Sequence, residues 1–196
     1  MIKLDIPFYS QFTNVAQEEW KERACAPTCL KMVLDFLSGG KFEKGIDDLI
    51  KEGLVIVGGY EPGNGWTHAG IIRLAHNHGF QAYLEEFRTI KVNVEEKTFS
   101  KSDFEDLLIE KGIEKIKNTL GSGLPVIISC SKNFDEFHKF HQVVLIGFDE
   151  NLPAGEAGGF YYHEPHKESK DEGANRFVDF ETFRTHWRKF AIFLAK

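Results

Sequence analysis

Apolar residues recur at helical spacing in five parts of the chain. The clearest pattern predicts an amphipathic helix that starts near Pro27 and ends at the glycine pair 39–40, because apolar side chains recur three or four positions apart within it. Weaker patterns predict helices over 46–52, 68–78, 104–120 and 179–187. Thr67 is a suitable N-cap for the helix over 68–78, and Ser102 or Asp103 for the helix over 104–120.

Strand patterns dominate the second half of the chain. One alternating run covers 80–87, and four β-rich runs follow over 124–130, 141–149, 159–165 and 189–195. Between them, we expect a long hairpin connection over 151–159 and a mobile polar surface loop over 166–176. Helices first and strands later predict an α+β fold, with the N-terminal helices packed on a mostly antiparallel sheet.

The length and composition are those of one globular domain. A chain of 196 residues buries about 70 % of its unfolded surface when it folds as one unit, so we expect a single domain over 1–196. Acidic and basic residues are interspersed at a net charge of −6, which argues against nucleic-acid binding, because that needs clustered Lys and Arg. No apolar run is long enough for a membrane span, and the N-terminus lacks a signal-peptide pattern.

Cysteine usage indicates a reducing environment. Three cysteines are too few for a disulfide scaffold, and their number is odd. We therefore expect free thiols, a cytoplasmic location and no cofactor.

Two of the cysteines bracket the start of the first predicted helix. Pro27 suits the first turn of a helix and disfavours helical geometry at Ala26, so Cys25 is expected just before the helix. Unsatisfied N–H groups and the positive end of the helix dipole stabilise a thiolate at such a position and lower its pKa. Cys29 lies on the apolar side of the same helix, which is typical of a core residue.

Other interpretations of these cysteines stay open at this point. Cys25 can be a small buried apolar residue. A redox pair of Cys25 with Cys29 is disfavoured, because three residues stand between these cysteines, whereas a Cys-x-x-Cys motif has two. A zinc site would need further ligands, such as histidines 163 and 166 or 76 and 78, at spacings that match no zinc finger, so we expect no metal.

A histidine and a carboxylate strengthen the catalytic interpretation. His141 opens the run 141–149, and Glu164 stands at the end of the next run. Adjacent antiparallel strands can place the two side by side, and with Cys25 they would form the nucleophile, base and orienting group of a thiol hydrolase. Asp149 and His163 are competing candidates for the orienting group, and exposed positions for His141 and Glu164 remain the alternative.

Seven segments stand in the order found in one papain-like group. They are IPFYSQF, CAPTCLKMVLDFL, GWTHAGIIRLAHNHGF, GLPVIIS, HQVVLIGFD, YYHEP and FETFRTHW. On these segments, which span nearly the whole chain, the sequence resembles the bacteriocin-processing, double-glycine-leader cysteine peptidase family, in its stand-alone branch without transporter domains. The resemblance implies a papain-like fold and a peptide or protein substrate.

The resemblance also implies roles for individual residues. Cys25 falls on the nucleophile, His141 on the base, Glu164 on the group that orients the base, and Gln11 on the side chain that helps form the oxyanion hole. Ala26 stands where the family usually has glycine. Glu164 replaces the usual aspartate or asparagine, so its arm is one methylene longer.

Other polar and aromatic residues are weaker candidates. Trp66, Thr67 and His68 follow a glycine-rich loop, as in the family, and could line a substrate cleft, although packing and helix capping are commoner roles. We expect Trp187 to anchor the last helix on the sheet and His166 to lie in solvent.

Three functions are compatible with these residues. The first is a peptidase that cleaves a peptide or related amide bond through a Cys-His-Glu triad. The second is a deamidase or acyl transferase with the same triad, because the triad does not determine the leaving group or the acceptor. The third is a catalytically weak peptide-binding module on the same fold.

Overall fold

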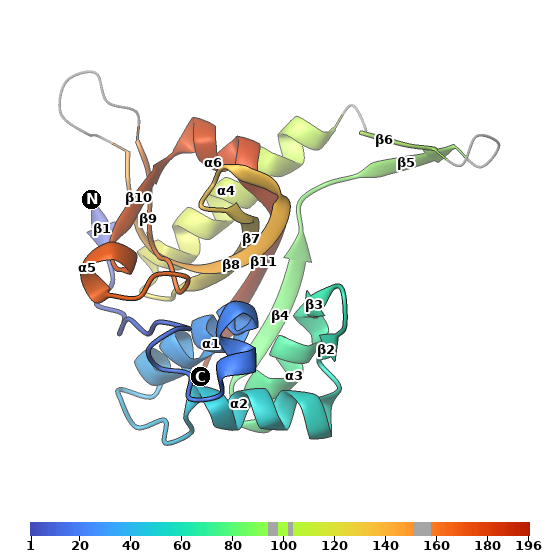
Figure 1. Cartoon of the computed structure of the whole chain (residues 1–196). Coiled ribbons are helices and arrows are strands. Elements are labelled where there is room, and N and C mark those ends of the chain that lie inside the picture. Colours follow the sequence, from blue (N-terminus) through green and yellow to red (C-terminus); the bar gives the residue numbers. More distant parts are fainter. Residues whose placement is uncertain (94–97, 102–103, 151–157) are drawn as a thin grey trace.

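The centre of the fold is a seven-stranded sheet (Figure 1). The computed structural model describes residues 1–93, 98–101, 104–150 and 158–196. The strands of the sheet are β1 (Ile2–Lys3), β4 (Gln81–Glu86), β7 (Val126–Lys132), β8 (Glu136–Asp149), β9 (Gly159–His163), β10 (Arg176–Asp179) and β11 (Trp187–Ala195). Their order is β10-β9-β8-β7-β11-β4, with β1 paired to β8, and each of these pairs is antiparallel.

Two small hairpins lie outside the main sheet. In the first, β2 (Tyr60–Glu61) pairs with β3 (Gly65–Trp66). In the second, β5 (Ile90–Asn93) pairs with β6 (Thr98–Lys101) and extends away from the rest of the molecule (Figure 1).

Helices cover both faces of the main sheet. They are α1 (Cys25–Leu37), α2 (Ile46–Glu52), α3 (His68–Asn77), α4 (Glu105–Gly121), α5 (Lys170–Gly173) and α6 (Phe180–His186), together with the 3₁₀ helix η1 (Glu18–Arg23) and the π-helix η2 (Gly53–Val57). The first three α-helices lie on one side of the sheet, and α4 and α6 lie on the other (Figure 1).

Side chains along a strand point alternately to the two faces of the sheet, which explains why the sheet supports two cores. In β7, Ile127 packs into the core under α1 and α3, while Val126 and Ile128 pack into the core under α4 and α6. Val144 and Val143 divide between the same two cores in β8. Because both faces are buried, these strands appear in the sequence as continuous apolar runs.

The predicted fold class is confirmed, and most predicted elements are present. The helix α1 begins two residues before Pro27, so Cys25 is its first residue and does not precede it. The side chain of Thr67 caps α3 as expected, by accepting the backbone N–H of Gly70 at 3.0 Å. Trp187 is buried and packs on Phe183 of α6, with ring centroids 5.3 Å apart.

One prediction needs correction, and two others fall on residues outside those that the structure describes. The segment 166–176 is not an irregular loop throughout, because it contains α5 and leads into β10. Residues 102–103 and 151–157, which include the proposed caps of α4 and most of the β8–β9 connection, lie outside the described residues. Within the described part of the chain, no helix combines the length and apolar character that crossing a membrane requires.

The contact of α4 with the sheet depends on one glycine. A Cβ atom at Gly112 would lie 2.6 Å from Cγ of Phe87 and 2.6 Å from Cη2 of Trp187. We therefore expect Gly112→Ala to lower the free energy of unfolding by about 1–3 kcal/mol through overpacking. Gly121→Ala, in the same helix, is the matched control, because its Cβ would meet only Ile2 at 3.8 Å. Urea unfolding measures both, and equal stability of the two variants would contradict this packing argument.

Candidate active site

A cavity of about 860 Å³ lies beside the first turn of α1. The β2–β3 hairpin, the start of α3 and strands β7, β8 and β11 contribute to its walls. Cys25 and His141 both line it, as do Trp66, His68 and Arg188. A molecule in this cavity can therefore reach the sulfur and the imidazole together.

Helix α1 is fixed on β8 right beside His141. One turn along from Cys25, the Cys29 thiol donates a hydrogen bond to the carbonyl oxygen of Gln142, with 3.3 Å between sulfur and oxygen. The backbone N–H of Gln142 in turn donates to the sulfur of Cys25, which also forms a hydrogen bond with the His141 ring. The packing of the helix on the strand thus holds Cys25 and His141 together.

Glu164 lies on the other side of the His141 ring. Nε2 of His141 forms a hydrogen bond with Oε1 of Glu164, which leaves Nδ1 for the sulfur of Cys25. The same carboxylate oxygen accepts the backbone N–H of His166 at 2.9 Å. Glu164 directly follows β9, and the β8–β9 register brings it within a few positions of His141 across the sheet.

The three side chains sit in an enclosed environment. Cys25 is half-buried, while His141 and Glu164 are only 5 % and 1 % exposed. Buried charges are costly unless they are paired, so the protonation state of each group depends on the other two.

The pKa shifts of these groups favour a charged pair. Burial alone would raise the pKa of the Cys25 thiol, but the charge and the hydrogen bond of His141 outweigh it and hold the pKa below its ordinary value. Burial would lower the pKa of His141, but Glu164 and Cys25 raise it to about 10. Burial also opposes ionisation of Glu164, and His141 overcomes it, so the pKa of that carboxyl is lowered. The imidazolium of His141 therefore stabilises both the Cys25 thiolate and the Glu164 carboxylate, and the two anions in turn stabilise the imidazolium.

The other two cysteines have the opposite character. All three cysteines are free thiols, but Cys29 and Cys130 are fully buried. Burial raises the pKa of both thiols well above the ordinary value, and neighbouring negative groups raise it further. Cys29 is a core residue, as the helical pattern predicts.

Gln11 is buried near these groups, but its amide hydrogens point elsewhere. Nε2 donates to the carbonyl oxygen of Lys21 at 2.6 Å and lies 3.0 Å from Nδ1 of His166. The Gln11 backbone N–H donates to the carbonyl oxygen of Pro165 at 2.9 Å, which ties this segment to the one that carries Glu164. Among the hydrogen bonds of the described residues, none joins Gln11 to Cys25.

His166 is a residue of the site that the sequence did not reveal. The expectation that it lies in solvent is wrong, because it is half-buried, with its ring 5.9 Å from that of His141. Burial lowers its pKa to about 4, and the positive charges of Lys132 and His141 act in the same direction. The ring is therefore neutral near pH 7, so Nδ1 can accept a hydrogen from Gln11. Its position two residues after Glu164 is the one feature of the sequence that could have indicated that His166 belongs to the site.

The aromatic wall of the cavity contains Trp66. Its indole N–H donates to the carbonyl oxygen of Arg23 at 2.9 Å, which fixes the ring beside the start of α1. Trp20 and Tyr60 also line the cavity, and their rings pack on Trp66 with centroids 6.0 and 5.5 Å away. A ligand therefore meets an apolar surface of aromatic rings on this side.

His68 lines the cavity, whereas Thr67 has a structural role. Nε2 of His68 lies 2.6 Å from the hydroxyl of Ser129, and both residues line the cavity. Burial and then the charge of Arg188 lower the pKa of His68, so its ring is neutral near pH 7. Thr67 is outside the cavity wall and caps α3.

The competing candidates for the orienting group are engaged elsewhere. Asp149 lies at the far end of β8 and pairs with the N-terminal amine of Met1 at 3.6 Å. His163 has Nε2 2.9 Å from the carbonyl oxygen of Ile6, and its Nδ1 accepts the backbone N–H of Asn175 at 3.1 Å. Within the residues that the structure describes, no three His, Cys, Asp or Glu side chains gather as metal ligands.

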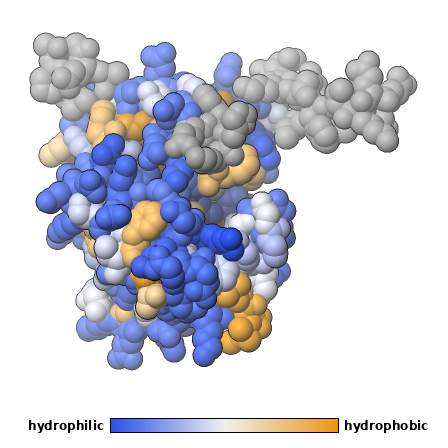
Figure 2. Space-filling view, viewed as in Figure 1, coloured by the Kyte–Doolittle hydropathy of each residue, from blue (hydrophilic) through white to orange (hydrophobic). Residues whose placement is uncertain are grey.

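An apolar surface adjoins one end of the cavity. Leu54 lines the cavity, and the next two residues of η2, Val55 and Ile56, are 77 % and 74 % exposed. Figure 2 shows an apolar patch at the lower right, where α2 leads into η2 in Figure 1. Solvent can thus reach apolar side chains right beside the cavity.

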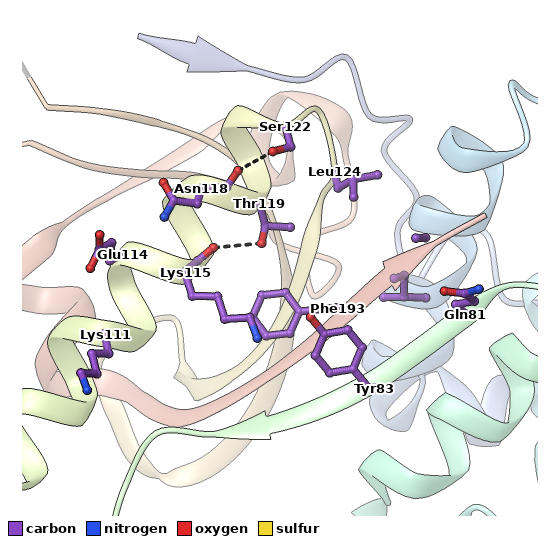
Figure 3. A pocket seen from close by; sticks show the side chains of 12 residues that line it. Gln81, Tyr83, Lys111, Glu114, Lys115, Asn118, Thr119, Ser122, Leu124 and Phe193 are labelled. Atoms are coloured by element: carbon purple, nitrogen blue, oxygen red, sulfur yellow. Dashed lines mark hydrogen bonds between the residues drawn. The ribbon is translucent and has the colours of Figure 1, made fainter.

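A second cavity, of about 560 Å³, lies between α4 and strands β4 and β11 (Figure 3). Tyr83 and Phe193 stack in it with ring centroids 5.3 Å apart, and the ammonium of Lys115 lies over both rings. None of the 12 described residues that line it is a cysteine or histidine. It therefore offers no thiol or imidazole for nucleophilic catalysis.

A cysteine at the start of the central helix, beside a strand histidine paired to a carboxylate, is the arrangement of a papain-like cysteine peptidase fold. The chain belongs to the Peptidase_C39 like family, whose profile matches residues 3–192. No curated protein sequence matches the chain significantly.

Solved structures share this fold at low sequence identity. A putative C39-like peptidase from Bacillus anthracis aligns with a TM-score of 0.63 and 20 % identity, over 100 % of this chain and 97 % of that one. The double glycine motif protease of an AMS/PCAT transporter, solved with the leader peptide, aligns with a TM-score of 0.56 and 17 % identity, over 99 % of this chain and 94 % of that one. The peptidase domain of Streptococcus ComA, a bifunctional ABC transporter, aligns with a TM-score of 0.55 and 17 % identity, over 94 % of this chain and 98 % of that one.

The pKa directions predict the order in which the three thiols react. At pH 6, we expect a small alkylating reagent to modify Cys25 well before Cys29 or Cys130, because Cys25 alone of the three has a lowered pKa and is not fully buried. Mass mapping after a short exposure to iodoacetamide measures this order. Faster labelling of Cys29 or Cys130 in the folded protein would mean that Cys25 is not the activated thiol.

Proposed function

We propose that the protein is a thiol hydrolase that cleaves a peptide bond with Cys25, His141 and Glu164. The observation that carries this proposal is the continuous hydrogen-bonded chain from the Cys25 sulfur through His141 to Glu164, at the edge of a cavity of about 860 Å³. Family membership and the papain-like fold support the same reaction class.

Each group has a defined step in this reaction. The Cys25 thiolate attacks the carbonyl carbon of the scissile bond, and the carbonyl oxygen becomes an oxyanion. The His141 imidazolium then gives its proton to the leaving amine, so the C–N bond breaks and a thioester with Cys25 remains. Neutral His141 next takes a proton from water, whose oxygen attacks the thioester and releases the acid product. Glu164 holds the ring in one orientation and stabilises its positive form.

Backbone and amide N–H groups would stabilise the oxyanion. Cys25 is the first residue of α1, and no side chain caps this helix start in the structure, so its N–H can point at the developing charge. We assign the second donor to Gln11. In this structure the Gln11 amide hydrogens meet the carbonyl oxygen of Lys21 and Nδ1 of His166. Gln11 must therefore give up its hydrogen bond with His166 in order to donate to the oxyanion.

A peptide is the substrate class that the cavity favours. Its aromatic wall and the adjoining apolar surface offer area to side chains on either side of the scissile bond. One structural relative holds a leader peptide, so peptides with a double-glycine motif are a natural first set to test.

Mass spectrometry of a peptide library treated with the protein tests this function. We expect two fragments from each cleaved peptide, with the elements of one water added in total, and no fragments with Cys25→Ala. An intact peptide with an amide converted to an acid would instead indicate deamidation. Cleavage by Cys25→Ala at the parent rate would refute the role of this thiol.

Changes at Glu164 predict an altered pH profile. Activity needs the thiolate, present above the lowered pKa of Cys25, and the imidazolium, present below the raised pKa of His141, so kcat/KM should be high between the two. Glu164→Gln keeps an oxygen acceptor for the ring but removes the charge that raises the His141 pKa. Its alkaline limb should therefore move to lower pH, with kcat reduced about tenfold near pH 7.

A larger truncation and a distant carboxylate complete this test. We expect Glu164→Ala to lower kcat about a hundredfold while KM changes little, because orientation matters most in the transition state. Asp149→Asn, at the far end of β8, is the control and should keep the parent profile. An unchanged profile in Glu164→Ala together with a loss in Asp149→Asn would assign the orienting role to Asp149.

A further inference from the structure

An irregularity in β11 turns one cationic side chain into the cavity of Cys25. Trp187 pairs with Cys130 of β7 and Phe190 with the next residue, Ser129, so two extra residues lie between these pairs in β11. The second of them, Lys189, has φ of 67°, which is uncommon for a residue other than glycine. The first is Arg188, which lines the cavity. Bulges of this kind re-aim side chains next to active sites.

The Arg188 guanidinium is held over an aromatic ring. Its central carbon lies 3.4 Å from the centroid of the Phe140 ring, and Phe140 is 62 % exposed and also lines the cavity. This stacking covers one face of the planar guanidinium and leaves its N–H edges free to form hydrogen bonds. The side chain is half-buried, so its charge is screened less than that of a surface arginine.

The positive charge of Arg188 has no counter-ion within the described structure. Among the described carboxylates, none lies within ion-pair distance of it. The nearby Arg88 pairs with Glu86. Burial lowers the pKa of Arg188, and the positive charge of Arg88 lowers it further. Arginine stays protonated despite such a shift, and the neighbouring His68 is neutral. Among the described residues of the cavity wall, the one acid is Glu22, which lies near His166, with 3.8 Å between its Oε2 and Nε2 of that ring.

We propose that Arg188, stacked on Phe140, is a subsite for a carboxylate of the peptide substrate. This proposal rests on the proposed function, because it assumes that a peptide occupies the cavity next to Cys25. A guanidinium edge matches a carboxylate through two parallel hydrogen bonds, and the partly buried position strengthens them. The carboxylate can come from an Asp or Glu side chain near the scissile bond or from the C-terminus of the substrate.

Matched peptides distinguish these sources. One library of acetylated, C-terminally amidated octapeptides has a single position fixed in turn as Asp, Glu, Asn, Gln or Lys, and a second compares free acids with amides at the C-terminus. We expect the parent protein to cleave peptides with the acid at one position about tenfold faster in kcat/KM than those with its amide. A preference confined to the second library would assign the subsite to the terminal carboxylate. Equal cleavage of acids and amides throughout both libraries would overturn the proposal.

Variants of Arg188 connect the preference to this side chain. We expect Arg188→Gln to abolish the acid preference and Arg188→Glu to favour Lys at the same position, while cleavage of neutral peptides continues. Arg184→Gln is the matched control, because Arg184 is exposed, pairs with Glu110 and does not line the cavity. Circular dichroism confirms that each variant is folded. Persistence of the preference in folded Arg188→Gln would assign it to another residue.

A binding measurement separates failure of this subsite from failure of the proposed function. Fluorescent acid and amide peptides are titrated onto the Cys25→Ala variant, which retains Arg188 and needs no turnover. Tighter binding of the acid, weakened by added salt, would support the subsite even if no peptide is cleaved. Equal affinities would overturn it even if cleavage by Cys25 is established.

Discussion

The contact between His141 and Glu164 places two titratable side chains where solvent barely reaches them. Each would be costly to ionise alone in this environment, and each lowers that cost for the other. The same carboxylate oxygen receives the N–H of His166, and the backbone of the Gln11 segment is tied to Pro165. The segments around the site therefore meet at one buried charge pair, and the lowered pKa of Cys25 depends on the His141 member of that pair.

The two-sided sheet makes this enclosure possible. Its alternating side chains build one core under α1 and α3 and another under α4 and α6, so strands β7 and β8 are held from both faces. Cys29 fixes α1 on Gln142, one turn away from Cys25. The relative position of sulfur and imidazole is thus determined by helix–sheet packing, which is stiff, and not by a loop.

The cavity has an uneven charge distribution in a chain whose net charge is −6. One end has an aromatic wall of Trp20, Tyr60 and Trp66, and Arg188 contributes a positive charge that the described carboxylates leave uncompensated. The double insertion in β11 produces this asymmetry and leaves Lys189 in a strained backbone conformation.

Elements whose signals are local can be predicted from the amino-acid sequence. Apolar spacing is sufficient for α1, α3, α4, β7 and residues 141–149 of β8, because helix and strand periods act within a few residues of the chain. Resemblance to a family, with the helix-start position of Cys25, was sufficient to nominate the nucleophile, base and orienting group. The short polar strand β10 had no such signal, since its pairing with β9 makes it a strand.

How the side chains of the site meet depends on contacts between segments that are distant in the sequence. His141 lies on β8 and Glu164 directly follows β9, and the register of these two strands brings them together. The half-buried place of His166, the engagement of Gln11 with it and the direction of Arg188 all arise from contacts between distant segments. Periodicity describes which face of an element is apolar. It does not describe which residue of another element that face will meet, and the chemistry of this site depends on that pairing.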